Sequence, residues 1–350
     1  HVPVRCGSVF SDALYQSFWC AASNFPARWT EVESVAREDA RSLTVEDFVA
    51  RYERPNRPVI LERSLDGWAA YAQTETAAET TVTTIAAAST NTTETTTETT
   101  ITTTTTTATA KAYDHRNWTR DYLTRTAGNA TFNSGGHAFS LARYFQYADA
   151  STDDNPLYLF DKHFVRNTPQ FGQDYTPLPY FSRERDLFEV LAGTGYRPDH
   201  RWLIVGPARS GSRFHVDPNG TSAWNAVVSG AKKWVLFPPH IVPPGVHPSE
   251  DGGDVTSPVS LVEWFRGFYD TAALEGSGMV EGVCRAGETI FVPAGWWHLV
   301  VNLEFSIAVT QNYVSTSNLR SVLDFLGRSP KHVSGLPHDK RLHLRRRFLE

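Results

Sequence analysis

The segment Phe214-His215-Val216-Asp217-Pro218 sets the interpretation of this 350-residue sequence. On a β-strand, residues two apart project from the same face, so His215 and Asp217 would point together while Val216 faces away. A further imidazole is offered by His298, far downstream in Trp297-His298-Leu299. Two imidazoles and one carboxylate form a facial triad that suits Fe(II) and leaves coordination positions open for other ligands. On spacing alone this is a weak signal, because a surface histidine or a satisfied core histidine is the more frequent case, but it makes His215, Asp217 and His298 candidate iron ligands.

The sequence around this triad favours an all-β barrel. Short β-type runs follow one another, with turn signals at Ser229-Gly230 and at Arg285-Ala286-Gly287 between them. Many short strands separated by turns indicate a sandwich or barrel rather than alternating strands and helices. Upstream, Thr44 with Asp47 three residues later is typical of a capped helix start. The strands expected in the barrel region cover residues 201–205, 213–217, 223–228, 233–237, 288–292, 296–302 and 306–313.

Polar residues in the expected strands distinguish this barrel from a purely structural one. Lys232 and Lys233 alternate faces, so one of them would point inward and the other outward. An inward lysine needs an anionic partner, because an unpaired buried charge is costly. Asn225, Thr310 and Asn312 add polar groups to the same strands. We therefore expect a polar interior in which one of the two lysines holds the far carboxylate of an organic acid.

Composition narrows the class of protein. The chain is 41% hydrophobic and 20% charged, as expected of a globular fold. Its formal charge of −5 lacks the basic excess of a dedicated nucleic-acid binder. Its three cysteines form neither a disulfide framework nor a CxxC zinc pattern. Because we find no membrane span or signal peptide, we expect an intracellular protein. The basic run from Lys340 to Arg347 could be a nuclear address, although such runs are more often solvated helix faces.

The chain divides into four zones. Residues 1–72 mix aromatic and apolar residues with short helices and a strand at 57–62. Residues 73–112 are dominated by Thr and Ala, and such a tract cannot bury enough apolar surface to offset its ordering entropy, so we expect a disordered insertion. Residues 113–317 hold the barrel, and residues 318–350 form a basic helical tail.

Long ordered matches resemble the Jumonji-C (JmjC) family from about residue 40 to residue 317, outside the Thr-rich tract. They include Gly206-Pro207-Ala208-Arg209-Ser210-Gly211-Ser212, the segment around His215, and Pro293-Ala294-Gly295-Trp296-Trp297-His298. The resemblance extends to Gly220-Thr221-Ser222-Ala223-Trp224-Asn225 and to Ile307-Ala308-Val309-Thr310-Gln311-Asn312. It is strongest to the subgroup of the arginine demethylase and lysyl hydroxylase once called the phosphatidylserine receptor. Residues 1–35 resemble the segment that follows an F-box in some fungal members.

The resemblance implies a fold and a set of site residues. The fold is a double-stranded β-helix, which is a squashed cupin-like jelly roll surrounded by helices. The family's iron ligands correspond to His215, Asp217 and His298. The lysine that pairs with the 2-oxoglutarate carboxylate corresponds to Lys232, and the other positions that bind or line the cosubstrate site correspond to Thr310, Tyr158 and Asn225.

The resemblance also implies a reaction. Fe(II), 2-oxoglutarate and O2 would be used to hydroxylate a lysine or arginine side chain of a protein, or to demethylate it through hydroxylation of an N-methyl carbon. The predicted partner is a protein or peptide in the cell, with the nucleus favoured over the cytoplasm. Two alternatives stay open: a catalytically silent JmjC scaffold, and a cupin-type metalloenzyme that uses Zn or Mn without 2-oxoglutarate.

Overall fold

The computed structural model describes residues 5–6, 9–10, 12–71, 117–250, 253–274 and 276–350. The predicted Thr-rich insertion at 73–112 lies outside the described residues. The residues that flank it are close together, since the Trp118 backbone N–H donates to the Ala70 carbonyl over 2.9 Å. The chain therefore leaves and rejoins the described structure at nearly the same point.

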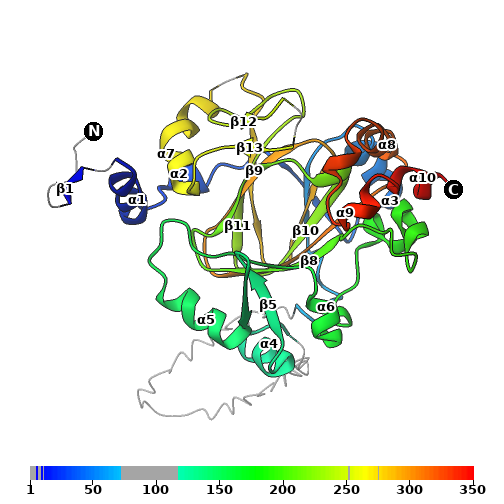
Figure 1. Ribbon diagram of the computed structural model, residues 1–350, viewed down its shortest axis with the longest axis horizontal. Helices are drawn as coiled ribbons and strands as arrows, with labels where there is room; N and C mark the ends of the chain where they lie inside the picture. The colour runs from blue at the N-terminus through cyan, green and yellow to red at the C-terminus, as the bar shows by residue number, and fades with distance from the viewer. Residues whose placement is uncertain (1–4, 7–8, 11, 72–116, 251–252, 275) are drawn as a thin grey trace, which may run out of the picture.

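Two antiparallel sheets face each other and form the barrel (Figure 1). In the larger sheet only the contact between β3 and β4 is parallel. The larger sheet contains, in spatial order, β3 (Ala36–Asp39), β4 (Val59–Glu62), β15 (Thr289–Val292), β10 (Ser222–Ser229), β17 (Ser306–Tyr313), β8 (Arg201–Gly206), β7 (Leu159–Asp161), β5 (Thr131–Ser134) and β6 (His137–Ser140). The smaller sheet contains β14 (Val280–Arg285), β11 (Ala231–Phe237), β16 (Trp297–Asn302) and β9 (Gly211–His215).

Successive strands alternate between these two sheets. The chain runs from β8 in the larger sheet to β9 in the smaller one, then to β10 and β11, and it repeats this alternation from β14 to β17. This path is that of a double-stranded β-helix, so the predicted mainly β, cupin-like jelly-roll fold is confirmed. Two short ribbons lie outside the barrel: β1 (Arg5–Cys6) with β2 (Val9–Phe10), and β12 (His247–Pro248) with β13 (Val255–Thr256).

Helices cover the outer faces of the barrel, and Figure 1 shows them around its periphery. Apolar residues of α7 pack on outward-facing residues of β11 and β16, in a cluster that includes Trp264, Phe265, Val235 and Leu299. The Thr44 cap is confirmed, because its hydroxyl accepts from the Asp47 backbone N–H at 3.0 Å. The α-helices are α1 (Asp12–Ala22), α2 (Ala27–Thr30), α3 (Val45–Phe48), α4 (Arg120–Ala127), α5 (Leu141–Ala150), α6 (Phe164–Asn167), α7 (Leu261–Ala272), α8 (Leu319–Arg328), α9 (His338–Arg341) and α10 (Leu344–Leu349).

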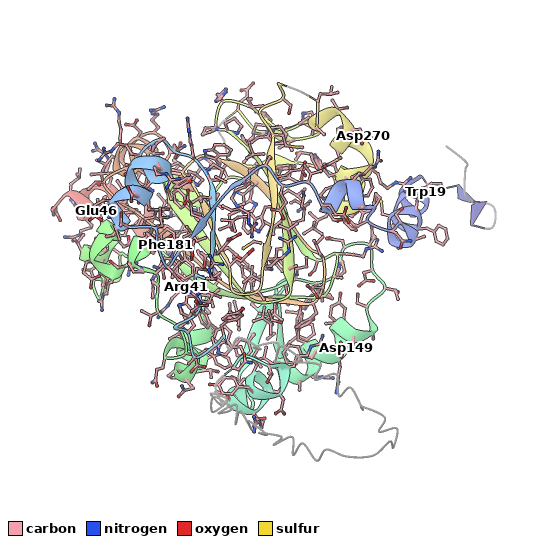
Figure 2. All side chains as sticks on the ribbon, turned by 180° about the vertical axis from the view of Figure 1, so that it is seen from behind. Trp19, Arg41, Glu46, Asp149, Phe181 and Asp270 are labelled. Atoms are coloured by element: carbon pink, nitrogen blue, oxygen red, sulfur yellow. The ribbon has the colours of Figure 1, made fainter. Side chains whose placement is uncertain are left out.

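The main core lies between the larger sheet and the segments packed behind it. Phe181 is fully buried there and stacks on Trp224 of β10. Figure 2 shows Phe181 inside the molecule and Trp19, Asp149 and Asp270 at its periphery. A separate cluster joins the short 3-10 segment Leu187–Leu191 to α8 and α10. None of the described helices is long and apolar enough to cross a bilayer.

One predicted strand is too long at its end. The strand expected over 213–217 ends at His215, and Asp217 stands before a 3-10 turn at Pro218–Gly220. Proline has no N–H for the strand ladder, and Asn219 adopts a left-handed φ of 60° that turns the chain. Asp217 nevertheless keeps extended dihedral angles (φ −58°, ψ 141°), so its side chain still reaches the face on which His215 lies.

Candidate active site

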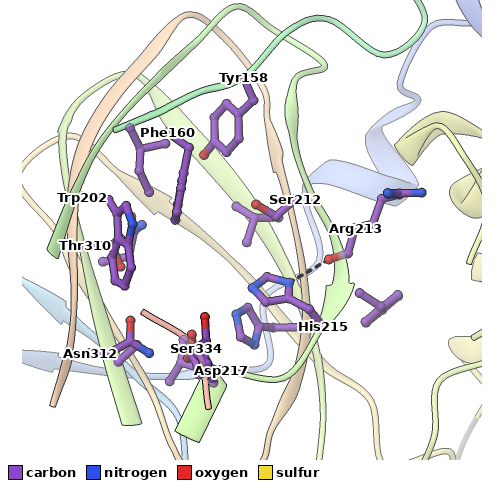
Figure 3. A pocket seen from close by; sticks show the side chains of 18 of the residues that line it. Tyr158, Phe160, Trp202, Ser212, Arg213, His215, Asp217, Thr310, Asn312 and Ser334 are labelled. Atoms are coloured by element: carbon purple, nitrogen blue, oxygen red, sulfur yellow. Dashed lines mark hydrogen bonds between the residues drawn. The ribbon is translucent and has the colours of Figure 1, made fainter. Parts of the chain in front are cut away.

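The three residues predicted to bind metal come together between the sheets. His215 is the last residue of β9, and His298 lies directly opposite it in the register of β16. Their ring centroids are 4.1 Å apart. One possible ligand atom from each of His215, Asp217 and His298 lies within 4.8 Å of the other two. Figure 3 shows His215 and Asp217 beside the cavity, with the Arg213 side chain directed away from it.

Backbone carbonyls orient both imidazoles. The Nδ1 of His215 lies 2.8 Å from the Arg213 carbonyl, and the Nδ1 of His298 lies 3.0 Å from the Trp296 carbonyl. A carbonyl only accepts hydrogen bonds, so each Nδ1 carries a proton, and Nε2 is the ring atom left to bind a metal. Such hydrogen bonds commonly fix metal-binding histidines. The Trp234 ring stacks on the His298 ring at 5.9 Å and further restricts it.

The carboxylate of Asp217 has a buried oxygen, Oδ2, with no hydrogen-bond partner among the described residues. Burial raises the pKa of Asp217, while the His215 ring and a hydrogen bond from Asn312 lower it. Burial and the adjacent His215 ring lower the pKa of His298 well below its usual value. The site therefore offers two imidazole Nε2 atoms and an unsatisfied carboxylate oxygen, a donor set that fits Fe(II) with open coordination positions.

A cavity of about 630 Å³ opens onto the triad. Tyr158, Asn225 and Thr310, which were predicted as cosubstrate residues, line this cavity together with the triad. Asn225 and Thr310 face each other in the register of β10 and β17. The buried Asn225 Oδ1 has no partner among the described residues, whereas the Thr310 hydroxyl donates to the Trp224 carbonyl at 2.8 Å. The interior is thus polar where the sequence predicted it.

Lys232 is fully buried beside this cavity. Its Nζ donates to the Tyr158 hydroxyl over 3.0 Å and to Asn302 Oδ1 over 2.7 Å. Burial lowers the pKa of Lys232 to about 7. Lys233 lies on the opposite face of β11 and forms an ion pair with Glu281 at 2.7 Å. The structure therefore answers the question that strand parity left open: Lys232 is the lysine on the cavity side.

Sequence reasoning missed several residues of the cavity. Trp234 could have been found, because it shares a strand face with Lys232. Ser334 and Gly335 also line the cavity, yet they belong to the C-terminal region. Asn219 holds them there through hydrogen bonds to the backbone N–H and carbonyl of Ser334. A contact across 115 residues left no local signal in the sequence.

Comparison with known proteins agrees with this geometry. Residues 45–318 match the family described as cupin-like domain. The chain is 44% identical over 336 residues to Arginine-specific demethylase JMJ22 of Arabidopsis thaliana, covering 95% of this chain and 57% of that protein. It is 35% identical over 321 residues to Bifunctional arginine demethylase and lysyl-hydroxylase psr-1 of Caenorhabditis elegans, covering 87% of this chain and 66% of the relative.

A third relative is 2-oxoglutarate and iron-dependent oxygenase JMJD4 of Homo sapiens, which is 36% identical over 232 residues. That match covers 59% of this chain and 52% of the relative. The chain therefore spans between about half and two thirds of the length of these three relatives.

Proposed function

This chain belongs to the cupin-like domain family, in its JmjC group, and from that premise we propose that it is an Fe(II)- and 2-oxoglutarate-dependent dioxygenase. Its proposed substrate is a lysine or arginine side chain of a protein. The observation that carries the proposal is the proximity of two features: a His-Asp-His cluster that lines the cavity and has an unsatisfied carboxylate oxygen, and a buried lysine that donates to the cavity-lining Tyr158 and has no acidic partner among the described residues.

In this proposal His215, Asp217 and His298 hold the iron through the two free Nε2 atoms and a carboxylate oxygen. When bound, iron with 2-oxoglutarate and O2 supplies the oxidation: the cosubstrate becomes succinate and carbon dioxide, and one oxygen atom enters a substrate C–H bond. If that carbon is an N-methyl group, the hydroxymethyl amine breaks down to formaldehyde and the demethylated amine.

The remaining residues bind and orient the cosubstrate. Lys232 would form a charge-assisted hydrogen bond with the carboxylate far from the metal, and the Tyr158 hydroxyl at 3.0 Å from its Nζ would share that carboxylate. Asn225 and Thr310 line the same cavity as the triad and face each other on two neighbouring strands, where they could contact the cosubstrate. The buried Trp234 and Val300 close the wall around His298 and exclude water.

A nuclear location is part of the proposal, and its support is the basic run at the end of the chain. Arg345, Arg346 and Arg347 are exposed on α10, where a receptor could read them. Ion pairs of Arg346 and Arg347 with Glu350 also fit a plain solvated helix. A fluorescent fusion in which all three arginines are changed to glutamine should leave the nucleus; unchanged distribution would contradict this part.

Product analysis tests the proposed activity. The purified chain would be incubated with Fe(II), 2-oxoglutarate, O2 and a panel of peptides that contain lysine, arginine or their N-methylated forms. We expect succinate together with either a peptide that has gained one oxygen atom or a demethylated peptide with formaldehyde. His298→Ala is the matched control and should give neither. Peptide binding without succinate would favour the silent scaffold, and turnover without 2-oxoglutarate would favour a cupin-type metalloenzyme.

A further inference from the structure

The side-chain amide of Asn302 is fixed on its nitrogen side. Its Nδ2 lies 3.0 Å from Ser210 Oγ, 3.3 Å from the Gly206 carbonyl and 3.4 Å from the Pro207 carbonyl. Carbonyls only accept hydrogen bonds, so the NH2 group must face them. The amide oxygen therefore faces Lys232, and it lies 2.7 Å from Lys232 Nζ.

The turn at residues 206–211 also forms hydrogen bonds with the backbone of Asn302. The Asn302 backbone N–H donates to the Ser210 carbonyl at 2.8 Å, and the Arg209 backbone N–H donates to the Asn302 carbonyl at 2.7 Å. A Cβ added to Gly206 would lie 2.2 Å from Ser210 Oγ and 2.8 Å from Asn302 Nδ2. Only glycine at this position leaves room for the hydrogen bonds. The segment 206–211 belongs to one of the stretches that resemble the JmjC family, and it holds Asn302 by hydrogen bonds to both the backbone and the side chain of that residue.

Because the amide of Asn302 is uncharged, it leaves the positive charge of Lys232 available to a bound anion. Asn302 Oδ1 and the Tyr158 hydroxyl are neutral, so they hold the lysine nitrogen in place without neutralising its charge. A carboxylate at the same position would form an ion pair with the ammonium and satisfy it internally. An apolar residue would leave one of its N–H groups without an acceptor.

We propose that Asn302, held by the turn at residues 206–211, is a positioning residue that presents a neutral oxygen to Lys232 and so reserves the lysine for the far carboxylate of a 2-oxo diacid. This inference rests on the proposed function, since it assigns the cosubstrate end of the same cavity. Asn302 acts through Lys232 and determines selectivity for a diacid over a monoacid.

Binding measurements test this role without turnover. Calorimetric titration of the Mn(II)-loaded protein, in which the metal is redox-inert, would give the affinities for 2-oxoglutarate and for pyruvate, a 2-oxo acid that lacks the far carboxylate. We expect Asn302→Asp to weaken 2-oxoglutarate binding at least about tenfold, because an internal acid competes for the ammonium. Pyruvate binding and Mn(II) binding should change less than about twofold, since neither uses Lys232.

Asn318→Asp is the matched control. Asn318 is also buried, and its Nδ2 donates to Ser222 Oγ at 3.1 Å and to the Tyr313 carbonyl at 3.2 Å, away from Lys232. It should lower thermal stability but keep the ratio of the 2-oxoglutarate and pyruvate affinities. If Asn302→Asp does not fold, Ser210→Ala removes one acceptor of the Asn302 amide, and it should weaken 2-oxoglutarate alone by about threefold.

Three outcomes separate the two levels of the claim. The inference is supported if the preference for 2-oxoglutarate over pyruvate is lost in the Asn302 or Ser210 variant but kept in the Asn318 control. A wild type that binds 2-oxoglutarate, with variants that bind both acids as the wild type does, overturns the inference and leaves the proposed function standing. A wild type whose binding of 2-oxoglutarate is no tighter than that of pyruvate overturns both.

Discussion

The two faces of strand β11 carry neighbouring lysines with opposite surroundings. Both Lys232 and Lys233 are fully buried. On the outer face, Lys233 Nζ lies 2.7 Å from a Glu281 carboxylate oxygen and 2.7 Å from the Val32 carbonyl. The Tyr269 hydroxyl lies 3.0 and 3.1 Å from the two oxygens of Glu281. On the inner face, the hydrogen bonds of Lys232 to the described residues go to the neutral oxygens of Tyr158 and Asn302.

This difference indicates that the charge of Lys233 stabilises the fold, whereas the charge of Lys232 is available for binding. Burial lowers the pKa of both lysines, but Glu281 opposes that shift at Lys233. A buried cation satisfied inside the protein contributes to the fold once its partner is present. A buried cation held only by neutral groups keeps a cost that a bound anion can remove. Lys232 on the inner face of β11 is therefore suited to binding an anionic ligand, whereas Lys233 on the outer face already has its anionic partner.

Removing the acid on the outer face should have the largest effect on stability. Glu281→Gln leaves the Lys233 charge buried without its ion-pair partner, so the free energy of unfolding should fall by about 3–5 kcal/mol. Denaturant unfolding followed by tryptophan fluorescence would measure it. The double variant Lys233→Met with Glu281→Leu is the control and should recover most of the loss. A loss below about 1 kcal/mol would show that the pair is not structural.

The corresponding change on the inner face should act on binding. Lys232→Met removes a buried charge that has no acid beside it, so the stability of the free protein should stay equal or rise by about 1 kcal/mol. Affinity for 2-oxoglutarate should fall by about 100-fold, since the far carboxylate loses its charged partner. Chemical unfolding and calorimetry on one preparation would give both numbers. A large loss of stability with unchanged affinity would reverse the assignment of the two lysines.

The pH dependence of binding sharpens the contrast, because the pKa of Lys232 is about 7 in the fold against an ordinary 10.5. Between these values the unfolded chain binds a proton that the folded protein has released, so the stability of the free protein should rise with pH in that window. Binding of 2-oxoglutarate needs the protonated lysine, so affinity should fall by about tenfold per pH unit above 7.

Below pH 7 the lysine is protonated in both states, and its contribution to both curves should be flat. The measurements are affinity and unfolding free energy at a series of pH values, with pyruvate as the ligand control. In Lys232→Met both dependences should disappear. Persistence of the loss of 2-oxoglutarate affinity above pH 7 in that variant would assign the titration to another group.

The smallest expected effect comes from the second neutral partner of Lys232. Tyr158→Phe removes the hydroxyl at 3.0 Å but keeps the ring, whose centroid lies 5.3 Å from Lys232 Nζ. One hydrogen bond of about 1 kcal/mol corresponds to about fivefold weaker binding of 2-oxoglutarate. Competition by 2-oxoglutarate against a fluorescent analogue would detect it. An effect as large as that of Lys232→Met would mean that Tyr158, not Lys232, is the main carboxylate ligand.

The sequence predicted those features of the site that follow from alternation along a strand or from the family motifs. Alternation along a strand predicted that His215 and Asp217 share a face, even though Pro218 ends that strand early, and the family resemblance added His298. Parity could not decide between Lys232 and Lys233, since that choice depends on which face of β11 meets the other sheet. The polar positions Asn225 and Thr310 were expected inside, and the register pairs them across β10 and β17.

What the sequence could not give depends on contacts between distant segments. Asn302 acquires its place from the turn at 206–211, almost a hundred residues earlier, and an isolated asparagine at a strand end is more often a simple turn residue. The C-terminal wall of the cavity at Ser334 depends on the left-handed Asn219 that holds it. Neither leaves a periodic pattern, because tertiary packing rather than local propensity sets these positions.

The central claim is that the triad and Lys232 serve one iron and one 2-oxoglutarate molecule in the same cavity. Its most direct test is an anaerobic titration of the purified chain with Fe(II) and then 2-oxoglutarate, followed by visible absorption, with His215→Ala in parallel. The account predicts a charge-transfer absorption that requires both additions, succinate when oxygen is admitted, and neither signal in the variant. Tight metal binding with no dependence on 2-oxoglutarate would contradict it.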